Sequence, residues 1–290
     1  MKILLLGATG QLGRALLCDL EDIGEIVCPS KKEFDFRRLN ESRSYIEKIN
    51  PHIIINAAAY TLVDLAEREA NLAYQVNGLG PKMLAEVASK LDIPIIHFST
   101  NYVFDGQKKE PYHEEDIPSP INVYGRSKLE GENWIRKIHQ KHVILRTSWL
   151  FSLYGGKNFL KSMSSLLKTK SVLSVINDQI GSPTSSVLLS QVTKKIVKKL
   201  EDKSKNYFGT YHLTSLGVTD WHTYTLKILD CMQLKGIKTA LNSNDIKPIS
   251  SLNYPMEALR PINSSLNTEK IQYIFDLKLP FWEQAVENFF

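Results

Sequence analysis

The chain has 290 residues and a formal net charge of +5, and 43% of its residues are hydrophobic and 23% charged. This composition is typical of a globular protein with a large core, and it indicates neither disorder nor a membrane span. Acidic and basic residues are mixed along the chain, which argues against a nucleic-acid partner, and the lysines at 194–199 fit a solvated helix face.

The cysteines and histidines predict no metal site. Cys18, Cys28 and Cys231 are odd in number and lack C-x-x-C spacing, so they indicate neither a disulfide framework nor a thiolate zinc site. His139 and His142 lie among lysines, where we expect them at the surface. The apolar run at residues 3–6 is too short for a signal-peptide core, so we expect a cytoplasmic protein without a membrane anchor.

A strand, a glycine loop and a helix are predicted at residues 2–20. The loop has the spacing G-x-x-G-x-x-G, in which Gly7 permits a tight turn, Gly10 lets the backbone approach a pyrophosphate and Gly13 lets helix and strand pack closely. The sequence therefore predicts a dinucleotide site here. Its candidate cofactor-binding residues are Gly7, Thr9, Gly10, Gln11, Leu12 and Gly13.

The residues after the second predicted strand, 25–28, bear on which dinucleotide is bound. Ser30, Lys31 and Lys32 stand where a positive group accommodates a ribose 2′-phosphate, which favours NADPH over NADH. Exposed loop lysines without such a role are the alternative, so NADH stays possible. Asp35 is a candidate partner for the adenine ring, and we add Phe36 to the candidate cofactor-binding residues.

Small side chains end the third predicted strand, 52–56, and they would let a flat cofactor lie against the backbone. The next segment, 64–91, has the apolar pattern of one long helix, in which Asn77 is a polar break. The candidate cofactor-binding residues of this region are Ala57, Ala58, Ala59, Tyr60 and Asn77.

The fourth and fifth predicted strands, 94–98 and 142–146, complete a run of alternating strands and helices, and Thr100, Asn101 and Tyr102 follow the fourth. Functional residues belong at such carboxyl ends in a parallel sheet. We therefore predict an α/β fold: a Rossmann-type doubly wound parallel sheet with a smaller mixed α/β C-terminal substrate-binding lobe. The expected domains are residues 1–148 plus about 184–213 for the cofactor, and 149–183 plus 214–290 for the substrate.

Tyr124 and Lys128 are four residues apart in a predicted helix, so both side chains can enter one cleft. A phenol titrates near pH ~10, and an ammonium about 4 Å away lowers that value by about three units at an effective dielectric near 20. Such a tyrosine exchanges protons near neutral pH. The same spacing also occurs by chance on many helices.

Taken together, the glycine loop, Thr100 and the Tyr124/Lys128 helix resemble the extended short-chain dehydrogenase/reductase family, and within it the reductases of dTDP-4-keto sugars. The resemblance covers nearly the whole chain. It rests on residues 7–13, 56–60, Asp64, 66–67, 76–77, 99–100, 102–106, 124–128, 130–132, 146–149, 158–159, 178–179, Gly181, 183–184, Gly209, 211–212, Trp221 and 260–261.

The resemblance implies roles for these residues. Tyr124 would protonate the C4 carbonyl oxygen, Lys128 would hold the nicotinamide ribose and acidify Tyr124, and Thr100 would hydrogen-bond the same carbonyl. Trp149 could instead belong to the core, and Arg260, a candidate phosphate clamp, could instead pair with a carboxylate. The candidate substrate-binding residues are Thr100, Asn101, Tyr102, Trp149, Asn158 and Arg260.

Two residues depart from the family pattern. Asn101 stands where an aspartate is usual, which removes a charge beside Thr100 and could alter the rate or its pH dependence. Ala15 stands where some members carry a glutamate of a magnesium site between subunits. We therefore predict no metal, and a homodimer stays possible.

The expected function is NADPH-dependent reduction of a dTDP-4-keto-6-deoxy sugar, with dTDP-4-dehydro-L-rhamnose as the first choice, for rhamnose in cell-surface polysaccharides such as the lipopolysaccharide O antigen. The sequence leaves the sugar stereochemistry open. A dehydratase is disfavoured because Asn101 and Tyr102 replace its Asp-Glu pair. The alternatives are a reductase of another 4-keto nucleotide sugar and a non-catalytic NADP-binding subunit resembling that of methionine adenosyltransferase.

Overall fold

The computed structural model of the protein describes residues 1–202 and 204–290. At its centre lies a six-stranded sheet in the order β10-β5-β4-β3-β1-β2, in which every neighbouring pair is parallel. The sheet strands are β1 (Lys2–Leu6), β2 (Glu25–Val27), β3 (Ile53–Asn56), β4 (Ile95–Thr100), β5 (His142–Thr147) and β10 (Gly209–His212). The predicted Rossmann-type parallel sheet is confirmed.

The central strands are apolar on both faces because helices cover both. Ile54 of β3 stands in register between Leu4 of β1 and Ile95 of β4, and all three side chains are fully buried. The strand order reverses at β1, with β2 on one side and β3 on the other. In an open parallel sheet a ligand crevice lies at the carboxyl ends beside such a reversal.

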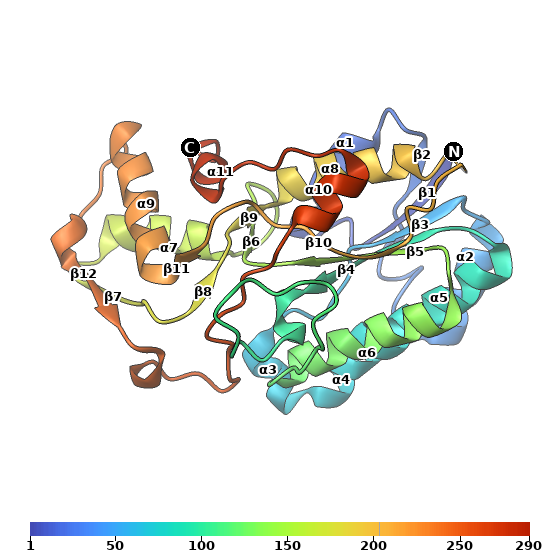
Figure 1. The fold of residues 1–290 in the computed structure, drawn as a ribbon, viewed down its shortest axis with the longest axis horizontal. Coiled ribbons are helices and arrows are strands. Elements are labelled where there is room, and N and C mark those ends of the chain that lie inside the picture. Colours follow the sequence, from blue (N-terminus) through green and yellow to red (C-terminus); the bar gives the residue numbers. More distant parts are fainter. Residues whose placement is uncertain (203) are drawn as a thin grey trace.

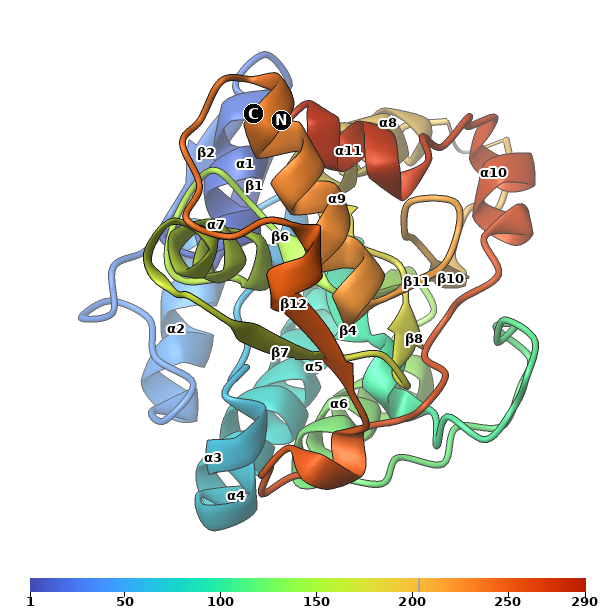
Figure 2. The ribbon, with the colours of Figure 1, turned by 90° about the vertical axis from the view of Figure 1, so that its left-hand side faces the viewer.

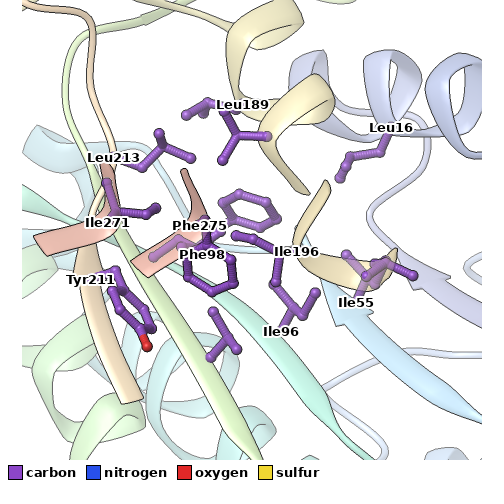
Figure 3. Packing of buried hydrophobic residues seen from close by; sticks show 14 of the residues in the cluster. Leu16, Ile55, Ile96, Phe98, Leu189, Ile196, Tyr211, Leu213, Ile271 and Phe275 are labelled. Atoms are coloured by element: carbon purple, nitrogen blue, oxygen red, sulfur yellow. The ribbon is translucent and has the colours of Figure 1, made fainter. Parts of the chain in front are cut away.

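One face of the sheet is covered by α1 (Gln11–Leu20), α8 (Ser186–Lys199) and α10 (Glu269–Phe275), and the other by α2 (Leu39–Ile49), α5 (Gly80–Leu91) and α6 (Val123–Ile138) (Figure 1). Figure 3 shows the packing on the first face, where Phe275 of α10 lies beside Phe98 of β4, in one cluster with Leu189 and Ile96. The burial of each of these apolar side chains stabilises the folded state by roughly 1.5 to 3 kcal/mol.

The predicted single helix over residues 64–91 is wrong. The segment forms α3 (Val63–Arg68), α4 (Ala70–Tyr74), a π-helical turn (Gln75–Leu79) and α5. Glu69 interrupts it with φ −109° and ψ 41°, values outside the helical region. Asn77 lies in the wide turn, where its amide bonds both backbone groups of Tyr60, so the polar break that the pattern shows serves a tertiary contact.

A second group of elements packs beyond the carboxyl ends of the sheet (Figure 2). It is built on α7 (Phe159–Thr169), α9 (Trp221–Leu234) and the parallel pair β7 (Leu173–Ile176) and β12 (Ile246–Ile249). Its short pieces are β6 (Leu150–Phe151), β8 (Ile180–Gly181), β9 (Thr184–Ser185), β11 (Thr219–Asp220), α11 (Trp282–Glu287) and 3-10 turns at Ser243–Asp245 and Ser251–Asn253. The expected domain boundaries stay a prediction.

His139 and His142 are buried, so their expected surface position is wrong. Their side chains are 5% and 9% exposed, and they bond the carbonyl oxygens of Ile93 and His139, respectively. Across residues 1–202 and 204–290, no helix is both long and apolar enough to cross a membrane. The same residues contain no group of three or more His, Cys, Asp or Glu side chains placed to hold a metal ion.

A buried ion pair fastens α6 to the sheet. Glu132 of α6 accepts hydrogen bonds from Arg146 of β5 at 2.7 Å and from the hydroxyl of Ser99 of β4 at 2.5 Å, and Arg136 approaches the same carboxylate to 2.9 Å. Burial alone would raise the pKa of Glu132, but the attraction and hydrogen bonds of Arg146 outweigh it and lower the pKa to about 2.

Replacing Glu132 with glutamine leaves Arg146 buried without its counter-ion, so we expect a loss of about 3 to 5 kcal/mol in the free energy of unfolding near pH 7. Because the folded pKa is depressed, this stabilisation is present above the ordinary value near 4.5 and is lost as the pH falls toward 2.

Urea unfolding at about pH 7 and about pH 3 measures both effects, and Glu132→Gln should differ less from the wild type at the acid value. Glu41→Gln is the control, because Glu41 pairs with Arg38 on the surface and is worth at most about 1 kcal/mol. A cost of Glu132→Gln below that of Glu41→Gln contradicts the structural role.

Candidate active site

The glycine loop between β1 and α1 separates two cavities. Gly7 has φ +80°, and a Cβ atom on Gly13 would lie 2.0 Å from the Gly7 oxygen, so the loop is a backbone cradle that side chains would fill. The free amides of the α1 N-terminus start at Gln11. One cavity, of about 360 Å³, lies on the β2 side of the loop, and the other, of about 520 Å³, lies toward β4 and α6.

The β2-side cavity contains most of the candidate cofactor-binding residues. Those that line it are Gly7, Thr9, Ser30, Lys31, Asp35, Phe36, Ala58, Ala59 and Tyr60. The sequence reasoning missed Arg37, whose guanidinium bonds both carboxylate oxygens of Asp35, with the shortest contact at 2.5 Å to Oδ2. The Ser30 hydroxyl donates to Glu33 at 2.8 Å. The signal that could have identified Arg37 is a further basic residue close behind the lysines of the same loop.

These residues fit the adenosine end of NADPH. The cradle leaves the backbone amides open to a pyrophosphate, and the cavity lining includes two cationic side chains, Lys31 and Arg37, the kind of group that accommodates a ribose 2′-phosphate. Gly13 and Asn77, both candidate cofactor-binding residues, line neither cavity. Gly13 packs against Gly7, and Asn77 acts on the cavity through the backbone of Tyr60.

The second cavity brings the three candidate catalytic residues together. Thr100 ends β4, and Tyr124 and Lys128 lie one turn apart at the start of α6. The candidate residues that line this cavity are Gly10, Gln11, Leu12, Ala57, Ala59, Thr100, Asn101, Tyr102, Tyr124, Lys128, Trp149 and Asn158. It is also lined by Thr147, Lys157 and Trp221, which the sequence did not predict as site residues.

The protonation of the pair differs from the expectation. Burial raises the pKa of Tyr124 to about 12, although a hydrogen bond with Thr100 acts in the opposite direction. Burial also lowers the pKa of Lys128 to about 8, against the attraction of Glu132. The expected acidification of Tyr124 by Lys128 is therefore wrong, because burial raises the pKa of the Tyr124 phenol more than its neighbours lower it. The Lys128 ammonium donates to the Phe98 carbonyl at 2.6 Å.

Asn101 makes use of both ends of its amide. Its Oδ1 accepts the Thr100 hydroxyl at 3.2 Å, and its Nδ2 donates to the carbonyl of Ser264 at 3.1 Å. A carboxylate could accept the first bond but could not donate the second. In this chain Asn101 therefore makes a contact, with the Ser264 carbonyl, that the family's usual aspartate could not make.

The far wall of the second cavity is aromatic. Trp149 has φ +43° and stacks on Trp221 of α9, with ring centroids 3.5 Å apart and planes 9° apart. The ring thus lines the cavity and also packs against the core of the second group of elements, so its role in substrate binding stays a prediction. Asn158 caps α7 and donates to Gln11 at 2.8 Å, which links this wall to the glycine loop.

Arg260 lies in an ion pair in this structure. Its guanidinium contacts both oxygens of Asp64 at 2.7 and 2.8 Å, which is the carboxylate partner that the sequence left as an alternative. Hydrogen bonds from Arg260 lower the pKa of Asp64 to about 2. Both residues line a further cavity of about 460 Å³, to which Tyr102 and Trp221 also belong and which therefore adjoins the second cavity.

Comparisons with known proteins match the chain over its whole length. The family model described as the RmlD substrate binding domain matches residues 1–290. The dTDP-4-dehydrorhamnose reductase of Salmonella typhimurium is 41% identical over 292 residues, which cover 99% of this chain and 96% of that protein.

Solved structures agree with this match. The dTDP-4-dehydrorhamnose reductase of Clostridium acetobutylicum has a TM-score of 0.88 at 34% identity, covering 100% of this chain and 98% of that one. The Bacillus anthracis enzyme of the same name, solved in complex with NADP, also has a TM-score of 0.88, at 35% identity over 99% and 98%. By the family model and these full-length identities, the chain belongs to the RmlD family of dTDP-4-dehydrorhamnose reductases.

Proposed function

We propose that the protein reduces the C4 keto group of a dTDP-4-keto-6-deoxy sugar with NADPH, and that dTDP-4-dehydro-L-rhamnose is its substrate. The observation that carries the proposal is the convergence of Thr100, Tyr124 and Lys128 on a cavity beside a dinucleotide cradle. Membership of the reductase family supports the choice of substrate and cofactor.

The three residues are suited to reduction. NADPH, when bound, supplies the hydride. The raised pKa keeps Tyr124 protonated at neutral pH, so its hydroxyl can give a proton to the carbonyl oxygen as that oxygen gains negative charge. Thr100 can hydrogen-bond the same oxygen once its hydroxyl turns from Asn101 Oδ1 to the carbonyl. Lys128 returns a proton to the tyrosinate, because the ammonium is the stronger acid of the two.

The nucleotide sugar is proposed to lie along the aromatic wall. Trp149 and Asn158 bound the second cavity, and Asn101 and Tyr102 lie at its boundary with the cavity that holds Arg260. A guanidinium matches phosphate oxygens as well as it matches a carboxylate. Arg260 would exchange Asp64 for the substrate diphosphate.

Two points stay predictions: a possible homodimer and the cytoplasmic location. The non-catalytic NADP-binding subunit remains the rival function. Mixing the protein with NADPH and the dTDP-4-keto sugar and following the reduced-nicotinamide absorbance separates the two. Tight NADPH binding without turnover favours the binding subunit.

Replacing Tyr124 with phenylalanine removes the proposed proton donor, so we expect kcat to fall by about 10²- to 10⁴-fold while NADPH still binds. Steady-state kinetics and a binding titration measure the two effects. Tyr273→Phe is the control, because Tyr273 is 90% exposed and lines neither cavity. Near-normal turnover in Tyr124→Phe would sink the assignment.

Lys31→Ala should raise the Kd of NADPH up to about fivefold and leave that of NADH unchanged, because the lost contact is an exposed one to the 2′-phosphate. Calorimetric titration with both nucleotides measures the difference. Lys32→Ala is the matched control, since Lys32 carries the same charge but does not line the cavity. An equal change for NADPH and NADH rules out the 2′-phosphate contact.

Arg260→Ala should raise the KM of the nucleotide sugar by roughly 10- to 100-fold, the range for a hydrogen-bonded charge, without changing the KM of NADPH. Arg68→Ala controls for the loss of a neighbouring ion pair, since Arg68 bonds Glu257 at 2.5 Å but lines none of the three cavities. The clamp is refuted if both variants have the same sugar KM.

A further inference from the structure

Three buried polar side chains form a line behind the catalytic cavity. Asn56 ends β3, His97 lies in β4 and Lys128 lies on α6, and their exposed fractions are 1%, 1% and 2%. The Asn56 Nδ2 atom is 3.0 Å from His97 Nδ1, and His97 Nε2 is 3.4 Å from the Lys128 Nζ. Of these, only Lys128 has a role in the proposed reaction.

The orientation of the Asn56 amide follows from its other contact. Its Oδ1 accepts the backbone N–H of Ala58 at 3.2 Å, so Nδ2 is the end that faces His97. An amide nitrogen only donates, and His97 Nδ1 must therefore accept. In a neutral imidazole the proton then resides on Nε2.

The neutral ring is the form that the surroundings permit. Burial, followed by the positive charge of Lys128, holds the pKa of His97 well below its usual range. The Nε2–H group thus points at Lys128 Nζ. An ammonium has three donors and no acceptor, whereas a neutral amine has a lone pair that can accept this N–H. The bond to the Phe98 carbonyl uses one N–H of either form.

We propose that Asn56 locks His97 in its Nε2–H tautomer and that these two positioning residues make Lys128 a stronger acid than its other neighbours alone would. Their role in turnover rests on the proposed reductase function. His97 does not itself relay protons, because its Nδ1 is occupied by an amide donor. In the return step the Lys128 N–H bond breaks and the Tyr124 O–H bond forms.

The other charges around Lys128 do not replace this contact. Glu132, one turn further along α6, attracts the ammonium, but it is itself paired with Arg146 of β5 and with Arg136. Arg146 also contacts His212 of β10, a histidine whose pKa burial and Arg146 lower to about 3. From the cavity side the titratable neighbour is Tyr124, which is neutral at physiological pH. His97 is therefore the group that directly opposes the ammonium.

Asn56→Asp tests the lock, because a carboxylate can keep the Ala58 bond and also accept a proton from His97 Nδ1. The tautomer then reverses, Nε2 accepts from the ammonium, and the titration of Lys128 moves upward by about one pH unit or more. Long-range ¹H–¹⁵N spectra of protein with ¹⁵N-labelled histidine report the tautomer, and the His97 shifts report the Lys128 titration between about pH 6 and pH 10. His97→Gln identifies the signals.

In the wild type we expect His97 to be protonated on Nε2 and unprotonated on Nδ1. In Asn56→Asp we expect the alkaline limb of the kcat/KM profile to move to higher pH. Asn133→Asp, which adds a carboxylate on the exposed side of α6, should change neither. A wild-type Nδ1–H tautomer, a charged ring near pH 7, or unchanged Lys128 titration in Asn56→Asp overturns the proposal. The spectra need no substrate, so they decide the tautomer even if the reductase assay fails or Asn56→Asp does not fold.

Discussion

The hydrogen bond from Lys128 to the Phe98 carbonyl, 2.6 Å long, is the contact on which the site depends. A buried ammonium must replace its water with protein acceptors, so this bond restricts how α6 can lie on β4. Thr100 follows Phe98 by two residues, and Tyr124 precedes Lys128 by one turn. Further along α6, Glu132 bonds β4 and β5, so the helix is fastened at a second point.

The cofactor side of the site could be predicted from the sequence because its determinants are local. Gly7 and Gly13 are six residues apart, and the small residues Ala57 to Ala59 directly follow a buried strand. Each pattern specifies one turn of backbone, and the parallel sheet then places all of these turns at one edge. The parallel sheet itself follows from the alternation of strands and helices, whereas the order of its strands is known only from the structure.

What escaped prediction depends on contacts between distant residues. Asp64 and Arg260 are 196 positions apart, and only the packing of the C-terminal segment across α3 pairs them. The acidity of Tyr124 was misjudged because burial, which spacing does not reveal, outweighs a neighbouring charge. Asn56 and His97 looked like parts of apolar strands, and the segment at 64–91 kept an apolar helical pattern across its break at Glu69.

The bond from Asn101 to the Ser264 carbonyl has a consequence for how the molecule is made. A nascent chain leaves the ribosome with its glycine cradle and Tyr124 already synthesised, but β10 and Ser264 come from its last third. Until β10 pairs with β5, β5 is an open edge of the sheet, and such an edge is prone to association with other chains. The Asn101 contact in the active-site cavity and the covering of the β5 edge are thus both completed late in translation.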